Sequence, residues 1–110
     1  MATPEGFAID VTASGDRTVV TVRGELDMSN TPSLIDTLTK DAGVGSSVVV
    51  DLSGVSFIDS SAIGGLVSAG QTLADAGGRL AIGPRSDTVG RVLEITGLAN
   101  GTDAFDVEDV

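Results

Sequence analysis

Large apolar residues alternate with smaller or polar ones near the start of the chain, and this period of two predicts a pair of strands. In residues 7–12 the large apolar side chains fall on every second position, as in a half-buried strand. Residues 17–23, rich in Thr and Val, form a second such segment, and a turn at 14–16 joins the two as an antiparallel hairpin. We predict a loop over residues 24–27, directly after the second strand.

Three consecutive β-branched residues further along predict a strand at the centre of the sheet. The run at residues 48–50 has no polar position and therefore indicates burial on both faces. Asp51 would then stand at the carboxyl end of this strand, and Ser53-Gly54 would turn the chain. Phe57 and Ile58 are predicted to be apolar anchors under the following loop.

Helical spacing of apolar residues predicts two helices around this strand. The first begins at 30–32, a polar cap followed by Pro, and ends at Gly43 and Gly45. Its apolar face comprises Leu34, Ile35, Leu38 and Ala42. The second has its N-cap candidates at 59–61 and stops at 77–78. Its core-facing stripe comprises Ile63, Leu66, Val67, Gly70, Leu73 and Ala74.

The last part of the chain predicts a strand, a helix and a final strand. Residues 80–82 form a short apolar run before the breaker at 83–84, and a third helix starts near residue 86 or 87. The apolar residues of that helix are Val89, Val92 and Leu93. Phe105 and Val107 predict a closing strand.

The resulting order, β-β-α-β-α-β-α-β, predicts an α/β fold. A hairpin followed by β-α-β units gives a mixed, mostly parallel sheet of about four to five strands with about three helices packed against it. Residues 1–110 are expected to form a single domain, with 1–5 flexible and 108–110 as a tail. Sites in such sheets lie at the carboxyl ends of strands, where Asp27, Asp51 and the 59–61 turn are expected.

Composition narrows the classes of function. The 110 residues include 6 basic and 16 acidic side chains, and the net charge of −10 argues against nucleic acids and anionic membranes as partners. The chain has no Cys and no His, which excludes thiol nucleophiles, His bases and metal sites built on those ligands. These absences favour a binding module or a substrate over an enzyme, with no cofactor and no metal.

The acidic residues are scattered, without the spacing of a calcium loop, and indicate a solvated surface. The acidic residues near the C-terminus are assigned the same role: Asp103, Asp106, Glu108 and Asp109. The first residues lack a basic region followed by an apolar one, and no apolar run reaches the length of a membrane span. We therefore expect a cytoplasmic protein.

Three segments together resemble one family. Residues 48–65 read VVVDLSGVSFIDSSAIGG, residues 24–27 read GELD, and residues 91–98 read RVLEITGL. These segments are similar, in order and spacing, to the signature of anti-sigma factor antagonists, the bacterial STAS domains. Ala62 stands where that family usually has Gly, and Ile63 where it has Leu. Many relatives continue into a further helix beyond the position of Val110, so part of a sheet face is expected to stay uncovered.

The resemblance implies a phosphorylation switch in stress-responsive transcription regulation. The unphosphorylated protein would bind an anti-sigma factor, which is also an ATP-dependent serine kinase, and so free the sigma factor. Phosphorylation would break that complex and a serine phosphatase would restore it. By position the acceptor is Ser60, with Ser61 as second choice. The implied partner-binding residues are Glu25, Asp27, Asp59, Ser60, Ser61, Ala62, Gly64 and Gly65. The protein is expected to be a monomer or a weak dimer.

The local chemistry of Ser60 fits this role. A serine at a helix N-terminus stands where the helix dipole favours an anion, and phosphorylation adds about −1.5 to −2 charge. The simpler interpretation is that residues 59–61 only cap the helix, as most such triplets do. Gly64 and Gly65 indicate either close helix packing or approach of a partner, whereas Gly70 favours close packing.

Two alternative functions remain. A STAS domain also serves as a scaffold or a ligand-sensing module in a signalling assembly, and the sequence does not separate that role from the antagonist. A receiver-like phosphoacceptor at Asp51 would require an acidic pair for Mg²⁺ and a late Lys. The first strand offers no such pair, and the single Lys, Lys40, lies in the first helix. A structural Asp51 that caps the loop is therefore favoured.

Overall fold

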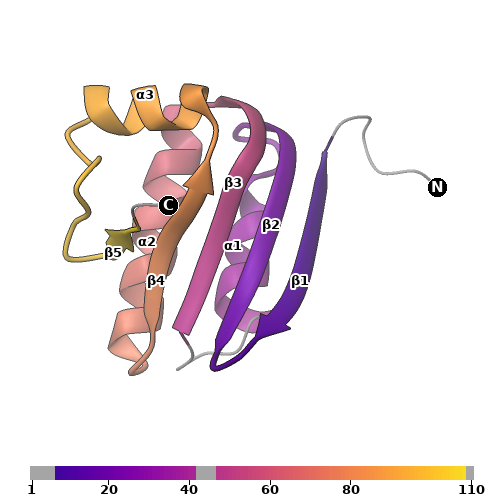
Figure 1. The fold of residues 1–110 in the computed structure, drawn as a ribbon, viewed down its shortest axis with the longest axis vertical. Coiled ribbons are helices and arrows are strands. Elements are labelled where there is room, and N and C mark those ends of the chain that lie inside the picture. The colour runs from indigo at the N-terminus through magenta and orange to yellow at the C-terminus, as the bar shows by residue number, and fades with distance from the viewer. Residues whose placement is uncertain (1–6, 42–46, 109–110) are drawn as a thin grey trace.

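The computed structural model describes residues 7–41 and 47–108, and within them five strands form one mixed sheet (Figure 1). The strand order follows the chain, with the first pair antiparallel and every later neighbour parallel. The predicted mixed sheet with an N-terminal hairpin is confirmed. The strands are β1 (Ala8–Ser14), β2 (Arg17–Leu26), β3 (Ser47–Ile58), β4 (Arg79–Arg85) and β5 (Phe105–Val107).

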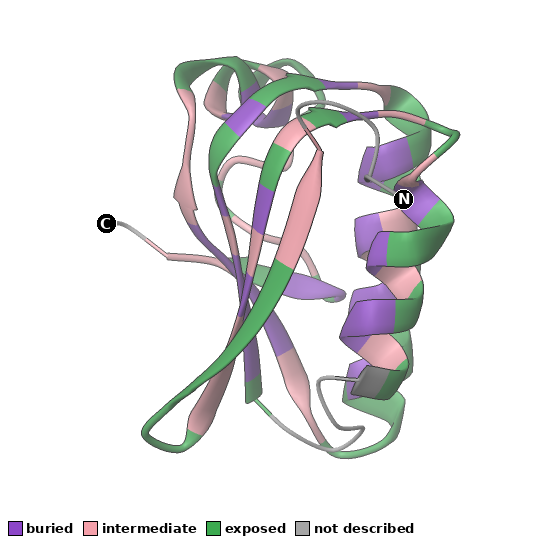
Figure 2. Ribbon diagram, turned by 90° about the vertical axis from the view of Figure 1, so that its right-hand side faces the viewer, coloured by how far each residue is buried: buried purple, intermediate pink, exposed green. Residues whose placement is uncertain are grey.

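The helices follow the predicted order. α1 (Thr31–Asp36) has Pro in its first turn and continues as a π-helical segment, η1 (Thr37–Asp41). α2 (Ser60–Asp75) lies beside α1 on one face of the sheet, and both turn their buried sides toward the strands (Figure 2). α3 (Asp87–Ile95) packs on β3 and β4 where these strands end. Ala42, Gly43 and Gly45, predicted to finish the first helix, lie outside the described residues, as do 1–5 and 109–110.

The core lies between the sheet and α1 and α2. Alternate residues of the three inner strands are buried in it, and they are Val20, Val22, Val48, Val50, Leu80 and Ile82. Val49 and Ala81 are 7% and 6% exposed although they point to the opposite face. The Val48-Val49-Val50 run is therefore buried on both faces, as predicted. On α2 the buried positions include Ala69, whereas the predicted Ala74 is exposed.

β3 is the main departure from the predicted elements. Ser53 and Gly54 do not turn the chain, because β3 continues through them to Ile58. Its pairing with β2 and with β4 shifts register near Asp51, which indicates a bulge. Asp51 thus lies inside a long strand, and the prediction that it ends the strand is wrong. Of the two predicted anchors, Ile58 is buried, but Phe57 is 48% exposed.

Two other strands, β2 and β4, also run further than predicted. β2 runs to Leu26, so residues 24–26 form a strand and not the predicted loop, because they pair with the extended end of β3. β4 continues through Gly83 and Pro84 to Arg85. Pro84 lies beyond Ile82, the last residue of β4 that pairs with β5, so this side of the strand is an edge there, and a missing backbone donor is tolerated.

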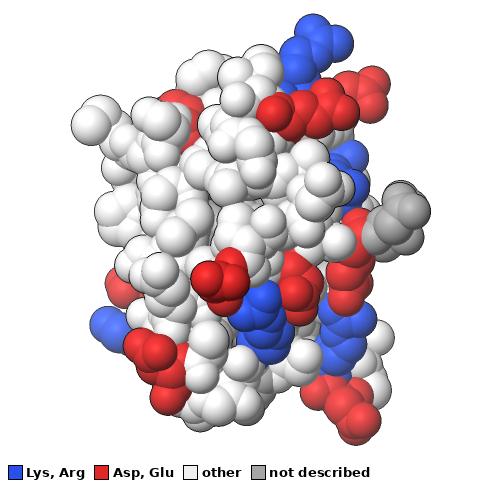
Figure 3. Space-filling model, turned by 90° about the vertical axis from the view of Figure 1, so that its left-hand side faces the viewer, with Lys and Arg blue, Asp and Glu red and all other residues white. Residues whose placement is uncertain are grey.

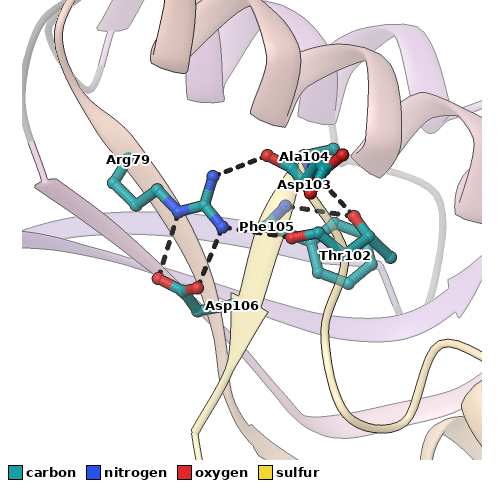
Figure 4. Close-up of polar contacts among 6 residues, drawn as sticks. All are labelled: Arg79, Thr102, Asp103, Ala104, Phe105 and Asp106. Carbon is teal, nitrogen blue, oxygen red and sulfur yellow. Dashed lines mark hydrogen bonds and ion pairs between the residues drawn. The ribbon is translucent and has the colours of Figure 1, made fainter.

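The C-terminal segment is held to the sheet by arginines. The Arg79 guanidinium donates to the Asp106 carboxylate at 2.9 and 3.1 Å and to the carbonyls of Thr102 and Asp103 (Figure 4). This hydrogen bonding lowers the pKa of the Asp106 carboxyl. Glu108 forms an ion pair with Arg17 on β2. The prediction that Asp106 and Glu108 only solvate the chain end is therefore wrong.

Gly70 shows how closely α2 approaches this segment. A Cβ on Gly70 would lie 2.1 Å from the backbone oxygen of Ala104. Close packing, the interpretation favoured for Gly70 from the sequence, is therefore confirmed. Gly65 has the same role, since a Cβ there would lie 2.7 Å from the Thr31 side chain on α1.

Candidate functional site

Ser60 is the first residue of α2 and is exposed to solvent. The preceding residue, Asp59, has an extended backbone and caps the helix, because its Oδ1 accepts a hydrogen bond from the backbone N–H of Ala62 at 3.0 Å. The predicted N-cap is confirmed at Asp59. The Ser60 hydroxyl is thus presented at the positive end of a 16-residue helix.

Asp59 also connects α2 to the loop between β2 and α1. Its Oδ2 accepts a hydrogen bond from the backbone N–H of Met28 at 3.2 Å. Its own N–H donates to the Leu26 carbonyl at 3.2 Å. The start of α2 and this loop therefore form one structural unit, although they are far apart in the sequence.

The loop itself is held by short-range hydrogen bonds. The Asp27 carboxylate accepts from the Ser29 hydroxyl at 2.6 Å and from the Ser29 N–H at 2.9 Å. These bonds lower the pKa of the Asp27 carboxyl, because they stabilise its ionised form. Asn30 does not cap α1 with its side chain; instead its Oδ1 accepts from the Asp27 N–H, and its amide donates to the Glu25 carbonyl.

The exposed residues around Ser60 form what we call the Ser60 surface: Met28, Ser29, Ser60, Ser61 and Gly64. Met28 is its largest apolar group and is 73% exposed. A Cβ on Gly64 would meet no atom within 4 Å, so this side of α2 is open. Sequence reasoning missed Met28, although an apolar residue in a polar loop was a usable signal.

The other predicted partner-binding residues divide into two groups. Glu25 is exposed and Asp27 is half-buried, and both lie near this surface. Ala62 is fully buried, and Gly65, which has no side chain, packs against Thr31 on α1. Partner binding by these residues stays a prediction.

Asp51 lies apart from the Ser60 surface. Its Oδ1 accepts from the Ser53 N–H at 2.9 Å and from the Ser53 hydroxyl at 2.7 Å, inside β3. Lys40 pairs with Asp36 across one helical turn. The described residues contain no group of three acidic side chains able to hold a metal ion. The two hydrogen bonds from Ser53 favour the structural role of Asp51.

A hollow lies beside α3, with a volume of about 360 Å³. Arg85 and Arg91 line it together with Asp87 and Glu94, so its charges balance. Basic side chains on this side of the molecule lie next to acidic ones (Figure 3). The hollow therefore shows no selective attraction for an anion.

None of the helices in the described part of the chain is long and apolar enough to cross a bilayer.

These observations define a small α/β domain that exposes a serine at a helix N-terminus, beside a loop held by an aspartate. The chain belongs to the STAS domain family, whose sequence pattern matches residues 8–109. None of the curated proteins matches the sequence closely enough to count as a relative.

Solved structures share the fold. An anti-sigma factor antagonist from Mycobacterium paratuberculosis is 24% identical, with a TM-score of 0.79 over 100% of this chain and 92% of that one. The anti-sigma factor antagonist SpoIIAA in its unphosphorylated form is 21% identical, with a TM-score of 0.74 over 94% and 88%. Phosphorylated SpoIIAA from Bacillus is 20% identical, with a TM-score of 0.65 over 94% and 91%. At these identities the likeness establishes the fold.

Proposed function

We propose that this protein is an anti-sigma factor antagonist that is switched by phosphorylation of Ser60. The observation that carries the proposal is the exposed Ser60 hydroxyl at the start of α2, beside a loop that Asp59 holds in place. The fold shared with antagonists, one of them known in a phosphorylated form, supports the same role. The partners are an anti-sigma factor with serine kinase activity and a phosphatase that reverses the modification.

The unphosphorylated Ser60 surface suits a protein partner. Met28 supplies exposed apolar area, and the neighbouring serines supply small polar groups. Gly64 allows a partner backbone to approach α2 closely, because no side chain projects there. The partner contact is therefore centred on Met28 and Ser60, with Glu25 and Asp27 at its rim.

Phosphorylation would break this contact without refolding the domain. A phosphate on Ser60 carries about −1.5 to −2 charge, and burying it against an apolar partner surface requires its desolvation. The helix N-terminus stabilises the same charge in the free protein. Both effects favour the dissociated state. Each loss of about 1.4 kcal/mol in binding free energy weakens the complex roughly tenfold.

The test is phosphate localisation by mass spectrometry. The purified protein is incubated with ATP and lysate of the source organism, alongside the Ser60→Ala and Ser61→Ala variants. We expect one phosphate on the wild type and on Ser61→Ala, and none on Ser60→Ala. A phosphate that persists in Ser60→Ala, or an acid-labile one on Asp51, would overturn the proposal. No phosphate at all, with the lysate kinase active on a control substrate, would favour the scaffold or ligand-sensing role.

A further inference from the structure

Among the described residues, β1 is an edge strand of the sheet. Within the described residues no strand pairs with its outer side, so one row of its backbone N–H and C=O groups faces away from the sheet. Natural proteins usually protect edge strands with charged side chains, Pro, bulges or short length. β1 has one charged residue, Asp10, but it is 7 residues long, contains no Pro and pairs with β2 without a register shift. The opposite edge, β5, has 3 residues.

β1 also leaves an apolar side chain uncovered. Val11 is 43% exposed, although its register partner Val20 is fully buried in the core. Paired residues on adjacent strands point to the same face, so Val11 lies on the helix-covered side of the sheet, beyond the reach of the helices. A further strand beside β1 would cover Val11 and extend the core layer.

We propose that this strand is β1 of a second copy of the chain, antiparallel and centred on Val11. A two-fold axis through Val11 is the one register that pairs all 7 residues of β1, since it places Ala8 opposite Ser14 and brings the two Val11 side chains together. The strand is thus complementary to itself.

Charge favours the same register. Asp10 is the one charged residue in β1, and the register places it opposite Thr12 and not opposite another Asp10. Arg23 on β2 neutralises Asp10 through a 3.1 Å contact within each copy. A register centred on Asp10 would set like charges directly opposite each other, which is destabilising. The register therefore keeps the two Asp10 carboxylates from lying directly opposite each other, and Arg23 offsets the charge of each one.

The dimer would be weak and would carry two copies of the Ser60 surface. One pair of edge strands buries less than the roughly 1,600 Å² of a standard interface, so the dimer should dissociate on dilution. Ser60 follows β3, two strands away from this edge, so each dimer carries two Ser60 surfaces. The proposal does not rest on the Ser60 switch, and its test needs neither a kinase nor a partner protein.

Single cysteines test the register, because the natural chain has no Cys. Directly opposed residues in antiparallel strands have Cα atoms about 4.5–5.5 Å apart, within the range of about 4.4–6.8 Å that a disulfide requires. The full-length Val11→Cys variant should therefore form a covalent dimer under mild oxidation. Ala13→Cys is the matched control: it is exposed on the same face, but the register separates its two copies by about 13 Å along the strands.

Sedimentation velocity provides the second readout. The wild type should show a mass that rises with concentration, and Val11→Lys should abolish that rise, because two ammonium groups would meet at the two-fold axis. Equal cross-linking of Val11→Cys and Ala13→Cys would indicate random collision and overturn the proposal. A wild type that stays monomeric, or a Val11→Lys variant that still dimerises, would overturn it as well.

Discussion

The Asp59 carboxylate accepts a hydrogen bond from the backbone N–H of Met28 at 3.2 Å, although the two residues lie 31 positions apart. Its other oxygen accepts from Ala62, so the same side chain caps α2 and holds the loop after β2. The residue before the proposed phosphorylation site is therefore both a helix cap and the link between the two segments of the Ser60 surface. Removal of the Asp59 carboxylate is therefore expected to have two separate effects, one on the helix and one on the loop.

Asp59→Ala should destabilise the protein and loosen the Met28 loop. Loss of an N-cap costs about 0.5–2 kcal/mol of unfolding free energy, measured by urea denaturation. Loss of the second hydrogen bond should also speed hydrogen exchange at the Met28 amide. Ser86→Ala is the matched control, because Ser86 caps α3 through the Val89 N–H and does not touch this loop. Equal exchange at Met28 in both variants would contradict the linking role of Asp59.

Ser60→Glu should weaken partner binding without destabilising the fold. Ser60 is exposed at the start of α2, where an acidic side chain typically adds about 0.3–1 kcal/mol of stability through the helix dipole. Urea denaturation should therefore give an unfolding free energy equal to or above that of the wild type. Calorimetry against the anti-sigma factor should give a lower affinity for Ser60→Glu than for Ser60→Ala. A clear loss of stability would show that the charge disturbs the fold itself.

Alanine at two glycines of α2 should have opposite effects. Gly70→Ala should destabilise the protein by more than about 1 kcal/mol, because its Cβ would overlap the Ala104 carbonyl and outweigh the helix propensity of Ala. Gly64→Ala should stabilise it by up to about 1 kcal/mol, because no atom lies near the new methyl group. Thermal unfolding of both variants measures these two effects. Stabilisation by Gly70→Ala would contradict the close contact between Gly70 and the Ala104 carbonyl.

Gly64→Ala also tests the proposed partner contact. The stabilised variant should bind the anti-sigma factor less tightly if a partner backbone approaches α2 at this position. An unchanged affinity would place the contact elsewhere on the Ser60 surface.

The contact between Arg79 and Asp106 should contribute stability that depends on pH. Arg79 lowers the pKa of the Asp106 carboxyl below its usual 3.8, so the contribution is complete above pH 3.8 and is lost as the pH falls through the lowered value. The unfolding free energies of the wild type and Asp106→Asn should therefore converge in acid. The difference at neutral pH should be small, because the Asp106 side chain is 59% exposed.

Asp103→Asn is the control for this contact. Asp103 lies close by and is exposed, but it interacts with Arg79 through its carbonyl and not through a carboxylate hydrogen bond. The difference in unfolding free energy between Asp103→Asn and the wild type should change less with pH than the difference between Asp106→Asn and the wild type. The opposite ranking would show that the pH dependence arises elsewhere.

Local patterns were sufficient to predict the order of elements and part of the site. Periodicity identified the hairpin, the buried valine run and α2, since each depends on neighbours close in sequence. The cap at Asp59 was also predictable, because an N-cap bonds to backbone only a few residues away. The resemblance to STAS domains singled out Ser60, and the structure places it on the surface at the first residue of α2.

Contacts between distant segments decided the rest. β3 extends through Ser53 and Gly54 because β2 runs beside it there, with Arg23 opposite Gly54, and supplies hydrogen-bonding partners that override a local turn signal. Asp59 reaches Met28 because β2 and β3 end side by side, with Leu26 opposite Ile58. Asp106 meets Arg79 and not only solvent because β5 pairs with β4. No local pattern encodes such alignments, because they arise only when the packed core brings remote backbone and side-chain groups within hydrogen-bonding distance.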